Sequence, residues 1–251
     1  MADYIIPNGQ YSWNQDIKIE GNDTIFVQSG GVLSSIVIPR WVGSVTLEDG
    51  AYLNGTIGTA KELSILGTVY GYGAILTLDI SERTPEEAIM INDWSQMATV
   101  EALSFCVGSG QGAGTYRLIG NASGFSRTVS ITNTQGAELG TLSLENPELD
   151  CDLRHYTLLL NEANELCLTV SSSLPSGTKI LLTRNGQIID ASLPFADGLT
   201  LPSGEYDHLF VVSDGFAEDI FVEYGGVITV TDEGTADAIH IDGGVLEGKH
   251  R

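Results

Sequence analysis

Short runs in which apolar and polar residues alternate, each followed by glycine or Asp-Gly, fill most of this chain. Alternation with a period of two is typical of β-strands, because successive side chains of a strand point to opposite faces. Long helical patterns are nearly absent. The pattern therefore predicts an all-β protein, and up to about residue 78 its strands are expected in DIKIEG, TIFVQSGG, SSIVIP, SVTLEDGAYLNG, ELSILGTVYG and AILTLDI.

The alternating runs recur at a spacing that fits stacked coils. GFAEDIFVEYGGV begins at residue 215 and GTADAIHIDGGV begins at residue 234, which is 19 residues later. A strand this short cannot bury its apolar face alone, but strands stacked in successive coils share one continuous core. Glycine supplies the positive φ angles that sharp corners require. We therefore predict a β-solenoid with coils of about 17 to 20 residues.

A longer repeat links the two ends of the chain. IPNGQYSWNQDI at 6–17 matches LPSGEYDHLFVV at 201–212, and the same offset of 195 residues pairs 23–33 with 218–228. Internal repetition of this kind indicates a repeated structural unit. We interpret the chain as one full copy of a unit of about 195 residues followed by the opening of a second. Without a gap, nine of the 28 positions from 6 to 33 are identical to their counterparts: Pro7, Gly9, Tyr11, Ile25, Phe26, Val27, Gly30, Gly31 and Val32.

The middle of the chain is predicted to be an antiparallel β module. After about residue 80 the runs lengthen and lose their Gly-Gly pairs, and Asn185-Gly186 between two apolar runs is typical of a two-residue hairpin turn. The module is expected to interrupt or cap the solenoid, whose open strand edges would otherwise invite aggregation. Three regions are therefore expected, namely a first solenoid over 1–79, the antiparallel module over 80–200 and the start of a second solenoid over 201–251.

One segment carries a helix signal. TPEEA at 84–88 places Thr84 as an N-cap, Pro85 at the first helical position and Glu87 three residues after the cap. This combination is typical of a helix start, because Thr and Glu satisfy backbone N–H groups reciprocally and proline tolerates the first position. The segment predicts one short helical turn.

The charge of the chain excludes some partners. Among 251 residues, 33 Asp and Glu stand against 11 Lys and Arg, which gives a formal net charge of −22. Nucleic-acid binding depends on Lys and Arg that neutralise phosphates, so nucleic acid is excluded as an expected partner. No run approaches the roughly 18 apolar residues that a membrane helix needs, so we expect no membrane insertion in this segment.

The three cysteines give no metal or redox motif. Cys106, Cys151 and Cys167 are odd in number and show no C-x-x-C spacing, which excludes a zinc finger and a disulfide-rich scaffold. The alternation places Cys106 and Cys167 on the faces of their strands opposite to the neighbouring Leu, Phe and Val residues. Two alternatives stay open, a single disulfide or semi-buried thiols with no chemical role.

A search for catalytic and metal-binding patterns nominates no residue. G-x-S-x-G, H-E-x-x-H and the EF-hand pattern are absent, and GSGQGAG at 108–114 lacks the Lys and Ser or Thr of a phosphate loop. The histidines lie near no serine or cysteine partner, and carboxylates at Asp-Gly turns leave calcium as a minor alternative. We therefore expect no catalytic residue, no cofactor and no metal. The four histidines are His155, His208, His240 and His250, and we interpret His208 and His240 as ordinary strand residues.

Carboxylates and aromatic residues carry the alternative hypotheses. Polysaccharide-cleaving β-helices hold acids close together on adjacent coils, and Glu218 with Asp219, or Asp237 with Asp242, could form such a pair. A second group consists of exposed aromatic residues that either stack on sugar rings or pack along the flank of the solenoid, namely Tyr52, Tyr70 and Tyr72.

The Gly-Gly coils resemble a known repeat. DTIFVQSGGVLSS, EDIFVEYGGVITV and GTADAIHIDGGVLEG resemble the AIDA-type repeats of bacterial autotransporter adhesins, and the section from GTYRLIG to ELCLTVS is similar to a β-rich module that alternates with such repeats. The resemblance implies a right-handed parallel β-helix on the cell surface that works in adhesion, aggregation or spacing. In some members sugars are attached to serines of the repeats. Because the motif is architectural, it implies no catalytic residue.

These observations lead to one expectation and one alternative. We expect a non-catalytic structural or adhesive module of a repetitive bacterial cell-surface or secreted protein, located outside the cell, with right-handed parallel β-solenoid segments flanking an antiparallel β module. Its expected partners are a host-cell surface, a glycan or another copy of itself. The alternative is a carbohydrate-active β-helix enzyme or a protein like a phage tail spike.

Overall fold

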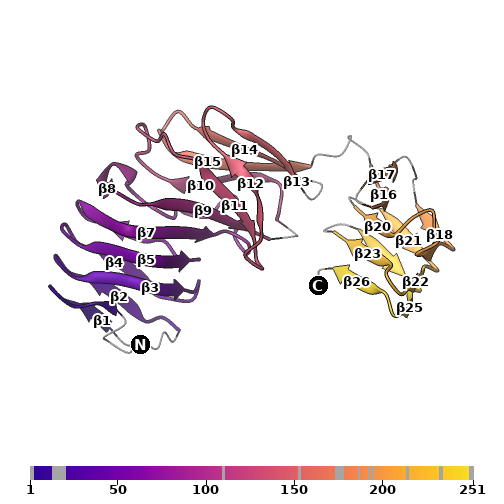
Figure 1. Ribbon diagram of the computed structural model, residues 1–251, viewed down its shortest axis with the longest axis horizontal. Helices are drawn as coiled ribbons and strands as arrows, with labels where there is room; N and C mark the ends of the chain where they lie inside the picture. The colour runs from indigo at the N-terminus through magenta and orange to yellow at the C-terminus, as the bar shows by residue number, and fades with distance from the viewer. Residues whose placement is uncertain are drawn as a thin grey trace. The chain divides into compact units, whose positions relative to one another are not determined.

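The chain folds into stacked β-strands, which confirms the predicted all-β class (Figure 1). The computed structural model describes residues 3–12, 21–108, 111–151, 154–172, 178–185, 187–191, 193, 195–212, 215–231 and 234–248. The chain divides into two compact units, Met1–Ser173 and Leu174–Arg251, which we call the first and second unit.

Parallel strands stacked coil upon coil form most of the first unit, as the solenoid hypothesis predicts (Figure 1). Successive coils pair in register: Val27 lies opposite Leu47, and Leu33 lies opposite Leu53. Each coil adds a strand to two sheets. One sheet holds β1 (Asp3–Ile6), β2 (Thr24–Val27), β4 (Ser44–Leu47) and β6 (Leu63–Ile65), and the other holds β3 (Val32–Ile38), β5 (Tyr52–Thr59), β7 (Val69–Asp79), β9 (Ala102–Val107) and β11 (Val129–Asn133).

The core of the first unit lies between these two sheets. The alternating apolar side chains of each strand point inward, and Ile6, Leu33, Leu53 and Leu76 are fully buried. Burying one such side chain contributes about 1.5–3 kcal/mol, so each coil is stabilised chiefly by the coils above and below it. This dependence explains why strands as short as the three residues of β6 hold together.

The antiparallel part of the first unit continues the same core. Its sheet contains β10 (Gly114–Ile119), β15 (Leu166–Ser172), β14 (Arg154–Leu160) and β13 (Glu148–Cys151) in that order, and β12 (Glu138–Leu142) pairs antiparallel with β11. Tyr116 and Tyr156 from this sheet are almost fully buried and belong to the same hydrophobic cluster as the solenoid strands. The antiparallel module is therefore packed onto the solenoid as one folding unit.

The solenoid extends further along the chain than predicted. Parallel pairing continues beyond residue 79, because β9 pairs with β7 and β11 pairs with β9. The corner after β7 is a long loop rather than a Gly-Gly turn, which is why the sequence pattern appeared to end there. This loop contains the 3₁₀ helix η2 (Trp94–Gln96), capped by Asp93, and the short strand β8 (Met97–Ala98).

The helical turn predicted at 84–88 is present only as one hydrogen-bonded turn, in which the N–H of Glu87 donates to the carbonyl of Thr84 at 3.3 Å, and no helix follows. Part of the capping arrangement is present nevertheless, since the backbone N–H of Thr84 donates to Glu87 Oε1 at 2.9 Å. The Glu87 carboxylate also binds Arg40 and Arg83. These contacts hold the loop against the solenoid and take the place of a continued helix.

The second unit begins with an antiparallel hairpin and continues as a solenoid. The hairpin consists of β16 (Ile180–Arg184) and β17 (Gln187–Asp190), and Arg184 lies opposite Gln187, which confirms the predicted two-residue turn. Asn185 in this turn has a φ of +52°. Strand β16 pairs antiparallel with β20 (His208–Val211), so the hairpin belongs to the second unit. The unit boundary consequently falls between residues 173 and 174, inside the region that the sequence assigned to the middle module.

Three sheets of short strands form the coils of the second unit, and strands of successive coils pair in parallel. Ala217 lies opposite Ala236 and Val222 opposite Ile241, which confirms the 19-residue coil. The first sheet continues from β20 to β23 (Val227–Val230) and β26 (Val245–Gly248). The second contains β18 (Ala196–Asp197), β21 (Phe216–Glu218) and β24 (Thr235–Asp237), and the third contains β19 (Thr200–Leu201), β22 (Phe221–Glu223) and β25 (His240–Asp242).

The repeat that links the two ends of the chain is structural. Ile6 pairs with Val27 in the first unit, and their counterparts Leu201 and Val222 pair in the same register in the second. Beyond the following turn the two copies diverge.

In the first unit Tyr11 bridges Val32, whereas in the second unit His208 lies opposite Val227. The ungapped alignment, which sets Tyr206 opposite Tyr11 and His208 opposite Trp13, is therefore off by two residues at this point. Trp13 lies outside the described residues. The copies thus share their first strand pair and their Gly-Gly corner, while the loop after the first strand, from Ile6 to Tyr11 and from Leu201 to His208, is two residues longer in the second copy.

Candidate functional site

The carboxylates proposed for an enzyme are arranged differently from the predicted pairs. In the second unit Glu218 lies opposite Asp197 on one side and Asp237 on the other, and all three are exposed. Asp219 leaves the strand with a φ of +55° and contacts His240 at 3.3 Å. Glu223 of β22 and Asp242 of β25 also lie opposite each other. The structure therefore forms ladders of acids between coils, which local sequence reading did not reveal.

The tyrosines lie on the outer face of the β5–β7 sheet. The rings of Tyr52 and Tyr70 stack with centroids 5.4 Å apart and an interplanar angle of 29°. The two rings therefore pack on each other along the flank of the solenoid, which is one of the two alternatives that the sequence left open. Tyr72, two residues further along β7, is 79% exposed and lies opposite Asn54.

His208 and His155 lie within strands and contact residues of their own strand or of a neighbouring strand. His208 Nε2 lies 2.8 Å from Thr229 Oγ1, and its ring stacks on Phe210. Burial lowers the pKa of His208, against the opposing influence of Glu247 and Asp207. His155 Nδ1 lies 2.9 Å from Asp150 Oδ1. His250 lies outside the described residues.

The cysteines are thiols, and no disulfide joins the three, all of which lie in described strands. Burial raises the pKa of both Cys106 and Cys167 to about 11, with further contributions from Asp79 and Glu165 respectively. Thiols with so high a pKa are poor nucleophiles at neutral pH. Within the described ranges no group of three or more His, Cys, Asp or Glu residues could hold a metal ion.

A pocket that the sequence did not reveal lies on the first unit, where β3, β5 and β7 end. It encloses about 330 Å³ on the outer side of the sheet. Val37 of β3 lies opposite Gly58 of β5, which lies opposite Thr77 of β7, so these residues form one row across three coils. The residues that line it are Val37, Ile38, Pro39, Arg40, Trp41, Gly58, Thr59, Ala60, Thr77, Asp79, Ser81, Glu82, Arg83 and Cys106.

Small side chains explain why the surface is hollow there. Gly58 has no side chain, and Ala60 and Thr77 have short ones, so the floor of the pocket stays close to the backbone. A Cβ built at Gly58 would meet only Val37, at 3.8 Å, which is ordinary van der Waals contact. Glycine is therefore not required by the backbone at this position, and its effect is to leave the floor open.

Two turns form the walls of the pocket. After β3 ends, Pro39 stops the strand, and the chain turns at Arg40 and Trp41; Trp41 is 62% exposed. On the other side the turn after β7 carries Ser81 and Glu82. The wall residues thus come from coils that lie about 40 residues apart in the sequence.

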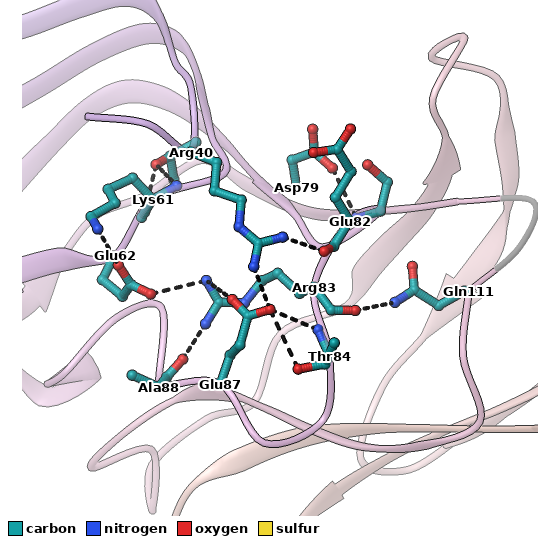
Figure 2. A network of polar contacts seen from close by, with 12 residues as sticks. Arg40, Lys61, Glu62, Asp79, Glu82, Arg83, Thr84, Glu87, Ala88 and Gln111 are labelled. Carbon is teal, nitrogen blue, oxygen red and sulfur yellow. Dashed lines mark hydrogen bonds and ion pairs between the residues drawn. The ribbon is translucent and has the colours of Figure 1, made fainter. Parts of the chain in front are cut away.

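A network of ion pairs holds these walls together (Figure 2). Arg40 donates to the backbone carbonyl of Glu82 and, at 2.6 Å, to Glu87 Oε1. Arg83 donates to Glu62 Oε1 at 3.1 Å and to the carbonyl of Ala88. The Arg83 side chain is only 4% exposed. Both arginines contact Glu87, so the corner after β3 and the loop after β7 are fixed to each other.

Two further contacts extend the network to the neighbouring coils. Gln111 Nε2 donates to the carbonyl of Arg83 at 3.4 Å, and Gln111 Oε1 accepts from the N–H of Gly108.

Partial burial raises the pKa of Glu62, but its hydrogen bonds to its own backbone, to Arg83 and to Lys61 outweigh that effect and hold the pKa below the usual value. Glu62 is therefore a stable anion at neutral pH.

The pocket offers both hydrogen-bond acceptors and donors beside an apolar floor. Asp79 Oδ1 accepts from the N–H of Ser81 at 3.0 Å. The Asp79 carboxylate also contacts the Cys106 thiol and contributes to its raised pKa. Formal charges in the lining balance, with Arg40 and Arg83 against Asp79 and Glu82. This arrangement suits a polar, uncharged ligand that has one apolar face.

Comparisons with known proteins provide no further constraint. Family models, curated proteins and solved structures were compared with the chain, and none matches. Within the part of the chain that the structure describes, no helix has the length and apolar character needed to cross a membrane.

Proposed function

We propose that this protein is a non-catalytic structural and adhesive module that presents the outer faces of β-solenoid coils to binding partners. The observation that carries this proposal is the coil built twice from positions 195 residues apart, with Ile6 opposite Val27 and Leu201 opposite Val222. The positions that the two copies share are those that pair one coil with the next, so the repeat preserves the backbone scaffold. Its function is then expected on the surface that the stacked coils present.

The differences between the two copies support the same proposal. Gly31 and Gly226 are retained, and each packs against a carbonyl oxygen of the preceding coil. In the next coil, by contrast, the residue opposite Val32 is Tyr52, while the residue opposite Val227 is Val245. Core and corner positions are thus shared, whereas an outer-face position has changed from an aromatic to an aliphatic residue. Such variation allows each coil to contact a different partner on the same scaffold.

Resemblance to AIDA-type repeats favours a place in a repetitive bacterial surface or secreted protein. The partners proposed on this basis are a host-cell surface, a glycan or a second copy of the chain. The net charge of −22 favours solubility and disfavours nucleic acid as a partner.

Three binding measurements on the purified chain test the proposal. Fluorescently labelled protein is titrated onto cultured epithelial cells, with and without glycosidase treatment, and onto a glycan array, and its self-association is followed by analytical ultracentrifugation. Saturable binding in at least one measurement is expected. Absence of binding in all three would overturn the adhesive part of the proposal and leave a spacer.

One observation favours the alternative, a carbohydrate-active β-helix enzyme or a tail-spike-like protein. Glu218 and Asp237 lie opposite each other on adjacent strands, which are about 4.8 Å apart in a sheet, and retaining glycosidases hold their carboxyl groups about 5–5.5 Å apart. Incubation with a panel of polysaccharides, followed by detection of new reducing ends, tests this alternative. Turnover that is lost in Glu218→Gln and retained in Glu205→Gln, a matched change at an exposed turn, would favour the enzyme.

A further inference from the structure

From the pocket at the ends of β3, β5 and β7 we infer that the first unit binds a neutral pyranose sugar, with Trp41 as the stacking surface. The inference deepens the adhesive part of the proposed function and rests on it. It places the adhesive contact at this pocket and names neutral pyranose sugars as its ligands.

The size of the pocket fits a single sugar ring. Its volume of about 330 Å³ lies at the lower end of the range for ligand pockets, which is about 300–1,000 Å³. The floor formed by Gly58, Ala60 and Thr77 lies close to the backbone, because none of these residues has a long side chain, and it leaves room for a ring. A pyranose ring is flat on one face, where its C–H groups are directed.

The aromatic wall supplies the second element of sugar recognition. Trp41 is 62% exposed although it lines a pocket whose neighbours are largely apolar. Large aromatic side chains are normally buried to a greater extent, and a tryptophan beside a concavity offers an apolar surface with one N–H donor. The C–H face of a sugar can stack on such a ring while its hydroxyl groups stay hydrated or bind polar neighbours.

The charges of the lining indicate that the ligand is neutral. Asp79 and Glu82 provide carboxylate acceptors, while Arg40 provides guanidinium donors and is itself 43% exposed in its side chain. A hydroxyl group donates and accepts, so it can use both kinds of partner. The formal charges of the four ionised lining residues cancel, and the net charge of −22 opposes an anionic ligand.

The pocket is also fixed before any ligand arrives. Arg40 is held by Glu87 at 2.6 Å and by the carbonyl of Glu82, and Arg83 is held by Glu62 (Figure 2). Binding therefore does not have to order the two turns that form the walls, and this lowers the entropic cost of association.

The test uses the full chain and simple sugars at millimolar concentration. Methyl glycosides of glucose, galactose, mannose and N-acetylglucosamine are compared with glucuronate and glucosamine by saturation-transfer NMR and calorimetric titration. At least one neutral glycoside is expected to bind, and to bind more tightly than both charged sugars.

Four variants assign the binding to the pocket. Trp41→Ala is expected to weaken binding by about tenfold or more, and Trp41→Phe, which retains a ring, is expected to weaken it less. Gly58→Thr fills the floor with a β-branched residue that a strand accepts, and it is expected to abolish binding without unfolding the chain. Tyr224→Ala in the second unit, where the side chain is 85% exposed, is the matched control and should bind like the unchanged protein.

The outcomes separate this inference from the proposed function. If no neutral sugar binds, or if Gly58→Thr and Trp41→Ala bind as well as the control while thermal unfolding shows all variants folded, the pocket inference is wrong. Tighter binding of glucuronate or glucosamine would overturn the neutral class. In each of these cases binding to cells, to an extended glycan or to a second copy elsewhere on the surface would still support the adhesive module.

Discussion

Gly31 lies so close to Ile6 that a Cβ on Gly31 would stand 2.2 Å from the carbonyl oxygen of Ile6. The same carbonyl accepts a hydrogen bond from the N–H of Gln28 at 2.9 Å, so it cannot move away without breaking the contact between coils. In the second unit a Cβ at Gly226 would stand 2.5 Å from the carbonyl oxygen of Leu201. Each corner therefore requires glycine because the backbones of two coils meet there.

Gly31→Ala is expected to destabilise the first unit by about 1–3 kcal/mol, the usual cost of forcing atoms into a packed site. Gly21→Ala is the matched control, because a Cβ at Gly21 would have no neighbour within 4 Å. Urea unfolding followed by tryptophan fluorescence reports the first unit, which contains Trp13, Trp41 and Trp94. Equal midpoints for the two variants would show that the corner tolerates a side chain.

Local features of the sequence predicted the coils correctly. Alternation with a period of two identifies which face of each strand is buried, and the Gly-Gly pairs mark corners where backbones approach closely. The 19-residue spacing then predicts that Ala217 lies beside Ala236, as observed. The hairpin at Asn185 was equally predictable, because its turn depends on two adjacent residues.

Features that depend on the pairing of distant coils could not be predicted. Glu218 meets Asp237 only because of the register between β21 and β24, and the pocket forms only because Gly58 of one coil lies opposite Thr77 of the next. The boundary predicted at residue 79 failed for a related reason. Strand β9 joins the parallel sheet through a long loop that carries no corner motif.

Acid is expected to weaken the first unit through Glu62. Its pKa is lower in the folded chain than the ordinary value of 4.5, so the unfolded chain takes up a proton first as the pH falls. The stability that Glu62 contributes is therefore fully present above pH 4.5 and is lost as the pH falls through the folded-state pKa. Urea midpoints measured by tryptophan fluorescence from pH 7 downward should fall less steeply in Glu62→Gln. Glu145→Gln, at an exposed position, serves as the control and should retain the steep fall.

The cysteines are expected to react in a fixed order. Cys106 and Cys167 are buried thiols with a pKa of about 11, whereas the side chain of Cys151 is partly exposed. Alkylation with iodoacetamide at pH 8, followed by mass spectrometry of peptides, should modify Cys151 first and the other two only after denaturation. Rapid native labelling of Cys106 would show that the outer side of β9 opens in solution.

His208 is expected to make the second unit sensitive to mild acid. Burial lowers the pKa of this histidine below 6.5 in the folded chain, so the unfolded chain binds a proton first. The corresponding stability is present above pH 6.5 and is lost as the pH falls through the folded-state pKa. Protection of peptides from 195–248 against hydrogen exchange, taken relative to the intrinsic exchange rate at each pH, should fall over this range, and the change should disappear in His208→Asn. A variant with the same pH dependence as the unchanged protein would assign the effect to another group.

Removal of one charge from the acidic ladder is expected to stabilise the second unit. Glu218 lies between Asp197 and Asp237 on adjacent parallel strands, and like charges directly opposite each other in a sheet are destabilising. Glu218→Gln should therefore slow hydrogen exchange in peptides from 195–248, most strongly at low ionic strength, because salt screens exposed charges. Glu205→Gln removes the same charge from an exposed turn of the same unit and corrects for the change in net charge. If both variants stabilise the unit equally, repulsion is spread over the whole acidic surface and is not concentrated in the ladder.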